Sequence, residues 1–399
     1  MTSDTGLPLT ENERDDYFDY TIRGLRSASF TFNLVEVITG YDAGTITPIS
    51  NSAPTLSHDV TRAVKRTLTL TLGVADTAKF DEIKHRVDVA MVLGDGRTFP
   101  LGRYMPVSFS RVPTTAGDMS SVALADELFV VSQPTVASFS AALIPGNAYT
   151  DDGVGRTNVF DVVNTFLDQY LLFNPTNYVG ALTSGSTAVT TTATQRGVER
   201  DIAFTNYVSS GSWQAGTNGT TVLADLSVSG DYFTPWMSND RHFRMIRTFN
   251  PADVVPTFDF DDQQNVIRDS ITRTNDLLDA PNQIVVVSNA GNADNRNSEI
   301  VGRYEVPATA PHSVARRGFV VASVQDLQIT TRAQANAIAR SIAVNQRTTE
   351  RVELSTPPDP RHDGYDVIRF DGVLWLEVSW SMALTEGGQM RHVLQRIYQ

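Results

Sequence analysis

The histidines of this chain, which could serve as metal ligands or general bases, are scattered. They lie at positions 58, 85, 242, 312, 362 and 392, and none forms a His-x-x-x-His pair or the His-Glu-x-x-His pattern of zinc hydrolases. We therefore expect structural or surface histidines, and we expect neither a metal nor a cofactor. His392 falls on the last predicted strand, where a hydrogen-bonded position within the sheet is the favoured role.

The tightest acidic group is formed by Asp259, Asp261 and Asp262. Such a group could bind calcium or supply the paired carboxylates that cleave a glycosidic bond. Phe258 and Phe260, however, alternate with the first two aspartates. This alternation is typical of an edge strand with one solvated face. A surface role is therefore favoured over metal binding or catalysis.

Other sequence signatures of enzymes are absent. The asparagine-rich loop 289–297 offers many oxygens but lacks the residue order of a calcium-binding loop. The sequence contains no Gly-x-Ser-x-Gly elbow, no phosphate-binding loop and no dinucleotide-binding glycine motif. It also has no cysteine for nucleophilic, redox or thiolate-metal chemistry. These observations predict a protein that is not an enzyme.

The four tryptophans could stack on sugars or lie at contacts between subunits. Trp380 belongs to an apolar stripe on a predicted strand, so we expect it in the core. Trp375 points to the opposite face of that strand, beside Glu377. We predict a contact between subunits at Trp375 and Glu377, whereas Trp213 and Trp236 are candidates for binding sugars.

Length and charge narrow the class of protein further. A chain of 399 residues exceeds the size of most single cores, so we expect two to four domains. The net charge of −13, without a cluster of Lys and Arg, argues against a surface that grips nucleic acid. An acidic surface could instead line a passage that DNA crosses without binding. The polar N-terminus and the lack of a long apolar run predict a soluble protein, made in a cytoplasm, that does not insert into a membrane.

The local patterns indicate mostly strands. Alternating apolar residues predict strands over 30–39, 68–72, 87–93, 99–109 and 120–124 near the N-terminus, which suggests an antiparallel barrel or sandwich. At the C-terminus, the patterns predict a helix along 335–342 and then strands over 352–354, 367–370, 374–384 and 390–397. Asp371-Gly372 predicts a tight hairpin, and the prolines at 357, 358 and 360 predict a loop.

The middle of the chain differs from both ends. It contains a predicted helix from Asn158 to Asn174, a stretch low in large apolar residues at 183–197, a short helix at 222–226 and a buried strand at 284–287. We therefore predict a mainly β fold with some α, in which two antiparallel β-barrel-like ring domains flank central α/β domains. The expected segments are an N-terminal arm at 1–20, a β-barrel-like domain at 21–140, a central α+β region at 141–310 and a β-meander with one helix at 311–399.

Several motifs, read in order, carry a resemblance to a known family. They are DVTRAVKRTLTLTL and FPLGRYMPVSFSR in the first β-region, and ERVELSTPPDPRHDGYDVI and MALTEGGQMRHVLQRI at the C-terminus. In this order they resemble the tail hub proteins of long-tailed bacteriophages, which are the minor tail or baseplate-hub proteins that close the end of the tail tube.

The resemblance implies a structural virion protein at the tail tip, assembled in the host cytoplasm. It implies a homotrimer whose two related β-domains per chain form a ring of six similar units around a channel for DNA. Its implied partners are a distal tail ring protein, a tape-measure protein and tip or receptor-binding proteins. Two alternatives remain open from the residues: a carbohydrate-binding tail adhesion protein that uses Trp213 and Trp236, and a wall-degrading enzyme that uses Asp259 and Asp261.

Overall fold

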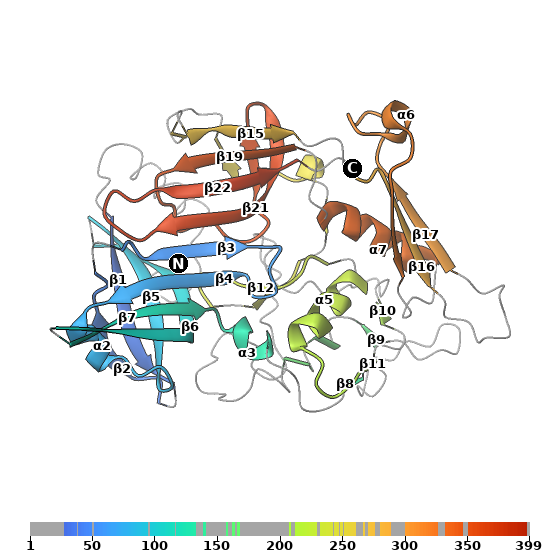
Figure 1. Cartoon of the computed structure of the whole chain (residues 1–399). Helices are drawn as coiled ribbons and strands as arrows, with labels where there is room; N and C mark the ends of the chain where they lie inside the picture. Colours follow the sequence, from blue (N-terminus) through green and yellow to red (C-terminus); the bar gives the residue numbers. More distant parts are fainter. Residues whose placement is uncertain are drawn as a thin grey trace.

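Strands dominate the architecture of the chain (Figure 1). The computed structural model describes residues 28–132, 139–140, 157–158, 162–163, 166–167, 207–325 and 332–396, apart from gaps at 38, 50–51, 95, 116, 209–211, 230–231, 242, 247, 250, 261–265, 268–269, 276–279, 289–299 and 346–349. The predicted mainly β class with some helix is confirmed.

The first β-region forms where apolar residues alternate with polar ones. Its strands are β1 (Ala28–Glu36), β2 (Asp42–Ile46), β3 (Thr55–Asp59), β4 (Arg66–Leu72), β5 (His85–Leu93), β6 (Thr98–Thr114) and β7 (Gly117–Ala125), with short helices α2 (Val74–Lys79) and α3 (Leu128–Ser132). On β4, Leu68, Leu70 and Leu72 are buried while the threonines between them are not, as the period of two requires.

The C-terminal meander also follows its local signals. Its strands are β19 (Glu350–Thr356), β20 (Val367–Phe370), β21 (Val373–Ala383) and β22 (Met390–Gln395). The predicted hairpin between β20 and β21 is confirmed, since Asp371 and Gly372 both have positive φ angles, of 55° and 68°. Trp380 and Met382 are buried in the core that β21 shares with the first β-region.

One continuous sheet joins the two ends of the chain. Strand β21 pairs with β3, which places Trp380 opposite His58, and the sheet of 13 strands runs from β15 (Thr272–Asn275) to β2. Short β14 (Phe258–Asp259) joins it through a parallel pairing with β20. These pairings form an open path among the described residues, so the two barrel-like ring domains stay a prediction, as do the domain boundaries.

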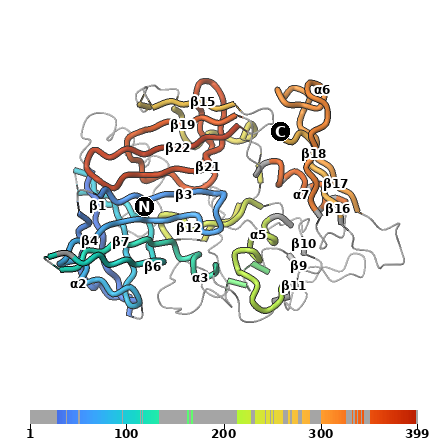
Figure 2. The backbone as a smooth tube through the Cα atoms, in the orientation of Figure 1, coloured from blue at the N-terminus to red at the C-terminus, as the bar shows by residue number. Residues whose placement is uncertain are grey.

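A second group of elements lies beside this sheet (Figure 2). It contains α5 (Gly219–Ser229), β12 (Trp236–Met237), β13 (Phe243–Arg244), the 3-10 turn Pro251–Asp253, β16 (Gln283–Ser288), β17 (Ile300–Glu305), α6 (Val314–Arg317), β18 (Val321–Gln325) and α7 (Arg332–Asn345), together with the short strands β8 (Phe139–Ser140), β9 (Thr157–Asn158), β10 (Tyr207–Val208) and β11 (Ser212–Trp213). The predicted apolar stripe of α7 is confirmed, because Ala335, Ile338 and Ala339 are buried against Ile284 and Val286 of β16.

Some sequence-based expectations fall outside the described residues. They are the arm at 1–20, the stretch at 183–197, the loop at 289–297 and most of the helix predicted from Asn158. Of that helix, the described pairs 162–163 and 166–167 are helical and buried. Within the described part of the chain, no helix is long and apolar enough to cross a membrane.

A close approach between β17 and α7 generates a first prediction. A Cβ atom added at Gly302 would lie 2.2 Å from the backbone carbon of Ala335, so Gly302→Ala must push the helix away from the sheet. We expect the free energy of unfolding, measured by urea denaturation, to fall by about 1–3 kcal/mol. Gly73→Ala is the control, because its Cβ would meet Ile49 at an ordinary 3.4 Å. Equal effects of the two substitutions would contradict the prediction.

Candidate functional site

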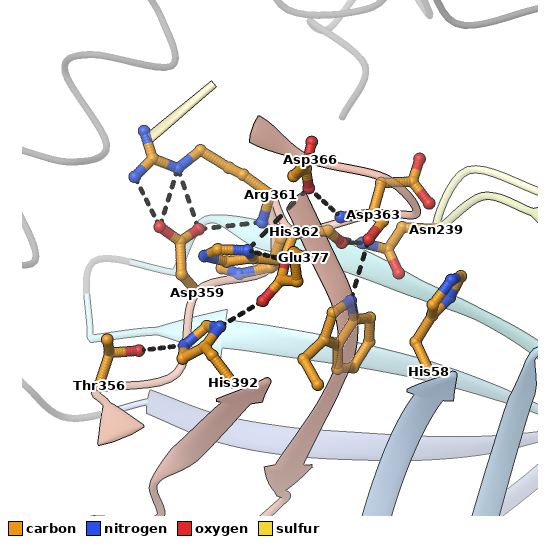
Figure 3. A network of polar contacts seen from close by, with 12 residues as sticks. His58, Asn239, Thr356, Asp359, Arg361, His362, Asp363, Asp366, Glu377 and His392 are labelled. Atoms are coloured by element: carbon orange, nitrogen blue, oxygen red, sulfur yellow. Dashed lines mark hydrogen bonds and ion pairs between the residues drawn. The ribbon is translucent and has the colours of Figure 1, made fainter. Parts of the chain in front are cut away.

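The loop between β19 and β20 carries an unusual number of buried polar side chains. Prolines at 357, 358 and 360 cannot extend the ladder of β19, so the chain leaves the sheet at the end of this strand and folds back over it. We call this segment, residues 357–366, the proline loop. We call the following side chains the polar cluster: Arg66, His58, Trp236, Asn239, Thr356, Asp359, Arg361, His362, Asp363, Asp366, Glu377 and His392. Figure 3 labels all of them except Arg66 and Trp236. The cluster joins the loop to strands from both ends of the chain.

Arg66 on β4 is the buried cation on one side of this cluster, and its side chain is 1% exposed. Its guanidinium donates to Asp363 Oδ1 at 2.7 Å, to His58 Nδ1 at 3.1 Å and to the side-chain oxygen of Asn239. It also lies 5.5 Å from the centre of the Trp380 ring, within cation-π range. A buried guanidinium needs such partners, because desolvation without them is costly.

Asp363 in the loop gathers contacts from three other segments. Its Oδ1 accepts hydrogen bonds from Arg66 and, at 2.7 Å, from the indole nitrogen of Trp236. Its backbone oxygen accepts from the indole nitrogen of Trp380 at 3.1 Å, and its backbone N–H donates to Asp366 Oδ2 at 2.7 Å. Asp363 therefore fixes the loop against β4, β12 and β21 together.

The turn between β12 and β13 is fastened to the same loop. The side-chain nitrogen of Asn239 donates to the backbone oxygens of Pro360 at 2.6 Å and His362 at 3.2 Å. Gly364 permits the close approach, since a Cβ there would lie 3.1 Å from both His58 Nε2 and the Trp236 ring. The middle of the chain is thus locked onto the sheet at the polar cluster.

The second half of the cluster is a His-Glu-His arrangement. The carboxylate of Glu377 on β21 forms two hydrogen bonds. One oxygen lies 2.8 Å from His362 Nδ1, and the other lies 2.5 Å from His392 Nδ1. His392 on β22 also contacts Thr356 Oγ1 through Nε2 at 2.7 Å. All three residues are buried, and His362 stacks on Phe258 with ring centres 3.9 Å apart.

Burial and neighbouring charges act in opposite directions on these three groups. Burial by itself raises the pKa of Glu377, but the charges of His362 and His392 and their hydrogen bonds outweigh it and lower the pKa to about 2. Burial lowers the pKa of both histidines; the Glu377 carboxylate reverses this for His362, whose pKa is raised, but not for His392, whose pKa stays lowered. Glu377 is thus an ionised carboxylate in the interior of the protein.

These three side chains could also hold a metal ion. One nitrogen from each histidine and one oxygen of Glu377 all lie within 4.8 Å of one another. Two imidazoles and a carboxylate are a common ligand set for zinc and related transition metals. Sequence spacing could not reveal this group, because its members come from a loop and two strands. The one signal in the sequence that points to the site is the group of His and Asp residues beside the prolines at 357–360.

The residues predicted for a subunit contact lie inside the chain. Trp375 and Glu377 are each 1% exposed; Trp375 packs in a core with Phe258, and Glu377 lies between the two histidines. Neither side chain faces outward, because Trp375 lies in that core and the loop between β19 and β20 places His362 against Glu377. The subunit contact itself stays a prediction, with little surface of either side chain to support it.

The other candidate residues also find places. Trp213 and Trp236 are buried, at 7% and 0% exposure, so the expectation of exposed aromatic rings for sugar binding is wrong. The hydrogen-bonded role expected of His392 is confirmed. Asp259 lies at the surface in an ion pair with Arg369 at 2.9 Å, as expected of an edge strand, whereas positions 261 and 262 lie outside the described residues.

The fold is similar to those of solved tail proteins. The tail protein from Neisseria meningitidis MC58 has a TM-score of 0.57 at 10% identity, with 92% of this chain and 97% of that chain covered. The prophage tail protein gp18 from Listeria monocytogenes EGD-e has a TM-score of 0.55 at 9% identity, with 92% and 95% covered. The 43 kDa tail protein of prophage MuSo2 from Shewanella oneidensis has a TM-score of 0.54 at 10% identity, with 92% and 98% covered.

Sequence comparison adds no relative, since no protein-family profile and no curated protein matches the chain. At identities this low, the three similarities show a shared fold. They confirm, at the level of the fold, the resemblance to phage tail proteins that the sequence motifs indicated.

The buried ion pair generates a second prediction. Asp363→Asn removes the carboxylate charge beside the buried Arg66, so we expect the free energy of unfolding to fall by about 3–5 kcal/mol. Asp259→Asn makes the same change in the exposed pair with Arg369, where we expect an effect below about 1 kcal/mol. Urea denaturation of both variants provides the measurement. If the two variants lost similar amounts of unfolding free energy, the burial of Arg66 would not be the reason why Asp363 stabilises the protein.

Asp126 generates a third prediction, on pH. Its carboxylate accepts the backbone N–H groups of Arg66 at 3.2 Å and Leu128 at 3.0 Å, and burial, opposed by the charge of Arg66, raises its pKa from 3.8 to about 7. Because the folded state favours the protonated form, Asp126 contributes stability that is complete below pH 3.8 and is lost as the pH rises through about 7.

We therefore expect Asp126→Asn, which does not titrate, to differ from the wild type in a pH-dependent way. The stability of the wild type relative to the variant should decrease between about pH 4 and pH 7, by up to about 4 kcal/mol. Urea denaturation of both proteins across this range measures the difference, in which groups common to both cancel. A constant difference would show that Asp126 has the same pKa in the folded and unfolded states.

Proposed function

We propose that this chain is a non-enzymatic structural protein of a phage tail, which forms the hub at the distal end of the tail tube. The observation that carries the proposal is the fold shared with three tail proteins over 92% of this chain and at least 95% of each of theirs. Similarity over nearly whole chains favours a common structural role more strongly than a shared single domain would.

The interior of the chain supports a role in which shape is the function. A continuous sheet joins the first and last β-regions, and the polar cluster fastens the middle of the chain to both. Buried, fully partnered charges tolerate little displacement, since losing one partner leaves a charge without compensation. A component that transmits load between a tube and a tip needs this stiffness.

We further propose that three copies assemble into a ring around a channel, which connects a hexameric tail ring to a three-fold tip. Closed rings of this kind require heterologous contacts from each copy to the next. Exposed apolar side chains on and beside β18, namely Phe319, Val321 and Val324, are available for contacts of this type. Among the described strands β18 pairs only with β16, so its other edge can accept a neighbour.

The charge of the chain suits a channel that DNA crosses without being held. With a net charge of −13, an acidic bore would repel the phosphate backbone instead of binding it. The proposed partners are the distal tail ring protein, the tape-measure protein and the tip or receptor-binding proteins, and the proposed location is the tail tip of the virion.

A fourth prediction tests the proposed hub directly. Native mass spectrometry of the purified full-length chain should give a homotrimer, and electron-microscope class averages should show a ring with a central opening. In virions, an antibody against the chain should label the distal end of the tail and no other position. A protein that stays monomeric at high concentration and labels no part of the tail would exclude the hub.

A further inference from the structure

The contacts around Thr356 suit a His392 that presents Nδ1 to Glu377. Thr356 Oγ1 lies 2.9 Å from the backbone oxygen of Pro357, which can only accept, and 2.7 Å from His392 Nε2. When the hydroxyl donates to Pro357, it accepts from Nε2–H of His392, and the lone pair of Nδ1 then faces Glu377 (Figure 3).

In this arrangement the other ring nitrogen of His392 lacks a proton to donate to Glu377. A neutral imidazole has one N–H, so a neutral His392 with its proton on Nε2 presents a bare lone pair at Nδ1. That nitrogen lies 2.5 Å from Glu377 Oε1, and a carboxylate oxygen is also an acceptor. Two acceptors at this distance repel each other unless a proton or a metal ion lies between them.

The two histidines lie close enough to share one ion with Glu377. The ring centres of His362 and His392 are 4.7 Å apart, and both rings are buried. One nitrogen of each ring and one oxygen of Glu377 lie within 4.8 Å of one another, so an ion between them could bind all three side chains.

We propose that the polar cluster binds a divalent transition metal, with zinc as the first candidate, through Nδ1 of His362, Nδ1 of His392 and the carboxylate of Glu377. Nitrogen ligands favour zinc and its neighbours over calcium or magnesium, which prefer oxygen alone. Asp366 Oδ2, 4.0 Å from His362 Nδ1, is a candidate for a fourth ligand. Ligand atoms around tetrahedral zinc lie about 3.3 Å apart, so the contacts of Glu377 with His362 at 2.8 Å and with His392 at 2.5 Å need to open by about 0.5 Å and 0.8 Å.

The surroundings have the features of a structural metal site. The contact from His392 Nε2–H to Thr356 orients the ring from behind, as outer contacts of ligating histidines do. The three ligands come from the proline loop, β21 and β22, and all are shielded from water. The ion would thus pin the loop to the sheet without an open position for substrate. This inference does not depend on the proposed tail function.

The fifth prediction is the metal content of the protein. Full-length protein purified at pH 7.5 without chelators should contain about one zinc ion per chain by inductively coupled plasma mass spectrometry. Removal of the ion with EDTA should lower the melting temperature by at least about 5 °C, and added ZnCl2 should restore it. Cobalt added to the stripped protein should give the visible absorption bands of a four- or five-coordinate ion.

Substitutions separate the proposed ligands from other buried histidines. His392→Gln and Glu377→Gln should lose the bound metal and the response to EDTA. His58→Gln is the matched control, because His58 is equally buried and accepts a hydrogen bond from Arg66, but is not a proposed ligand. It should keep one metal per chain. If the ligand variants fail to fold, the cobalt spectrum and EDTA response of the wild type decide the question.

The proposal would be overturned by a folded wild-type protein that contains no stoichiometric metal and shows no change in melting temperature with EDTA, Zn2+, Co2+ or Mn2+. Retention of the metal by folded His392→Gln and Glu377→Gln would equally exclude this site.

Discussion

The burial of Arg66 is the constraint on which the rest of this structure depends. A guanidinium in the interior is stable only when its donors find acceptors, and those of Arg66 come from β3, from the turn after β12 and from the proline loop. Three segments far apart in the sequence must therefore hold one geometry. The continuous sheet sets their approximate positions, and the polar cluster fixes their exact register to one another.

The proline loop ends a strand and also contributes buried side chains to the interior of the protein. Pro357, Pro358 and Pro360 end the ladder of β19, and the residues that follow would ordinarily lie in solvent. Here they fold under the β12 turn, so that His362 and Asp363 become interior groups. Apolar residues of similar size would often give equal or greater stability, whereas polar partners restrict the loop to one arrangement. This restriction holds the loop and the segments that it contacts in a fixed arrangement.

A shared fold at about 10% identity is understandable from the same physics. The sheet requires only that apolar residues alternate and that turns fall at the right places, and very many sequences meet these conditions. The outline of such a sheet can therefore be kept while the buried charges differ between proteins.

The sequence by itself determined the elements whose signals are local. The alternation in β4 and β5, the Asp371-Gly372 hairpin and the apolar stripe of α7 could be predicted because each depends on neighbours within a few residues. Only the tertiary structure decided the pairing of β21 with β3, the burial of Trp375 and the meeting of His362, Glu377 and His392. Those outcomes depend on which distant segments cover each face of a strand, and periodicity identifies a face without identifying what packs on it.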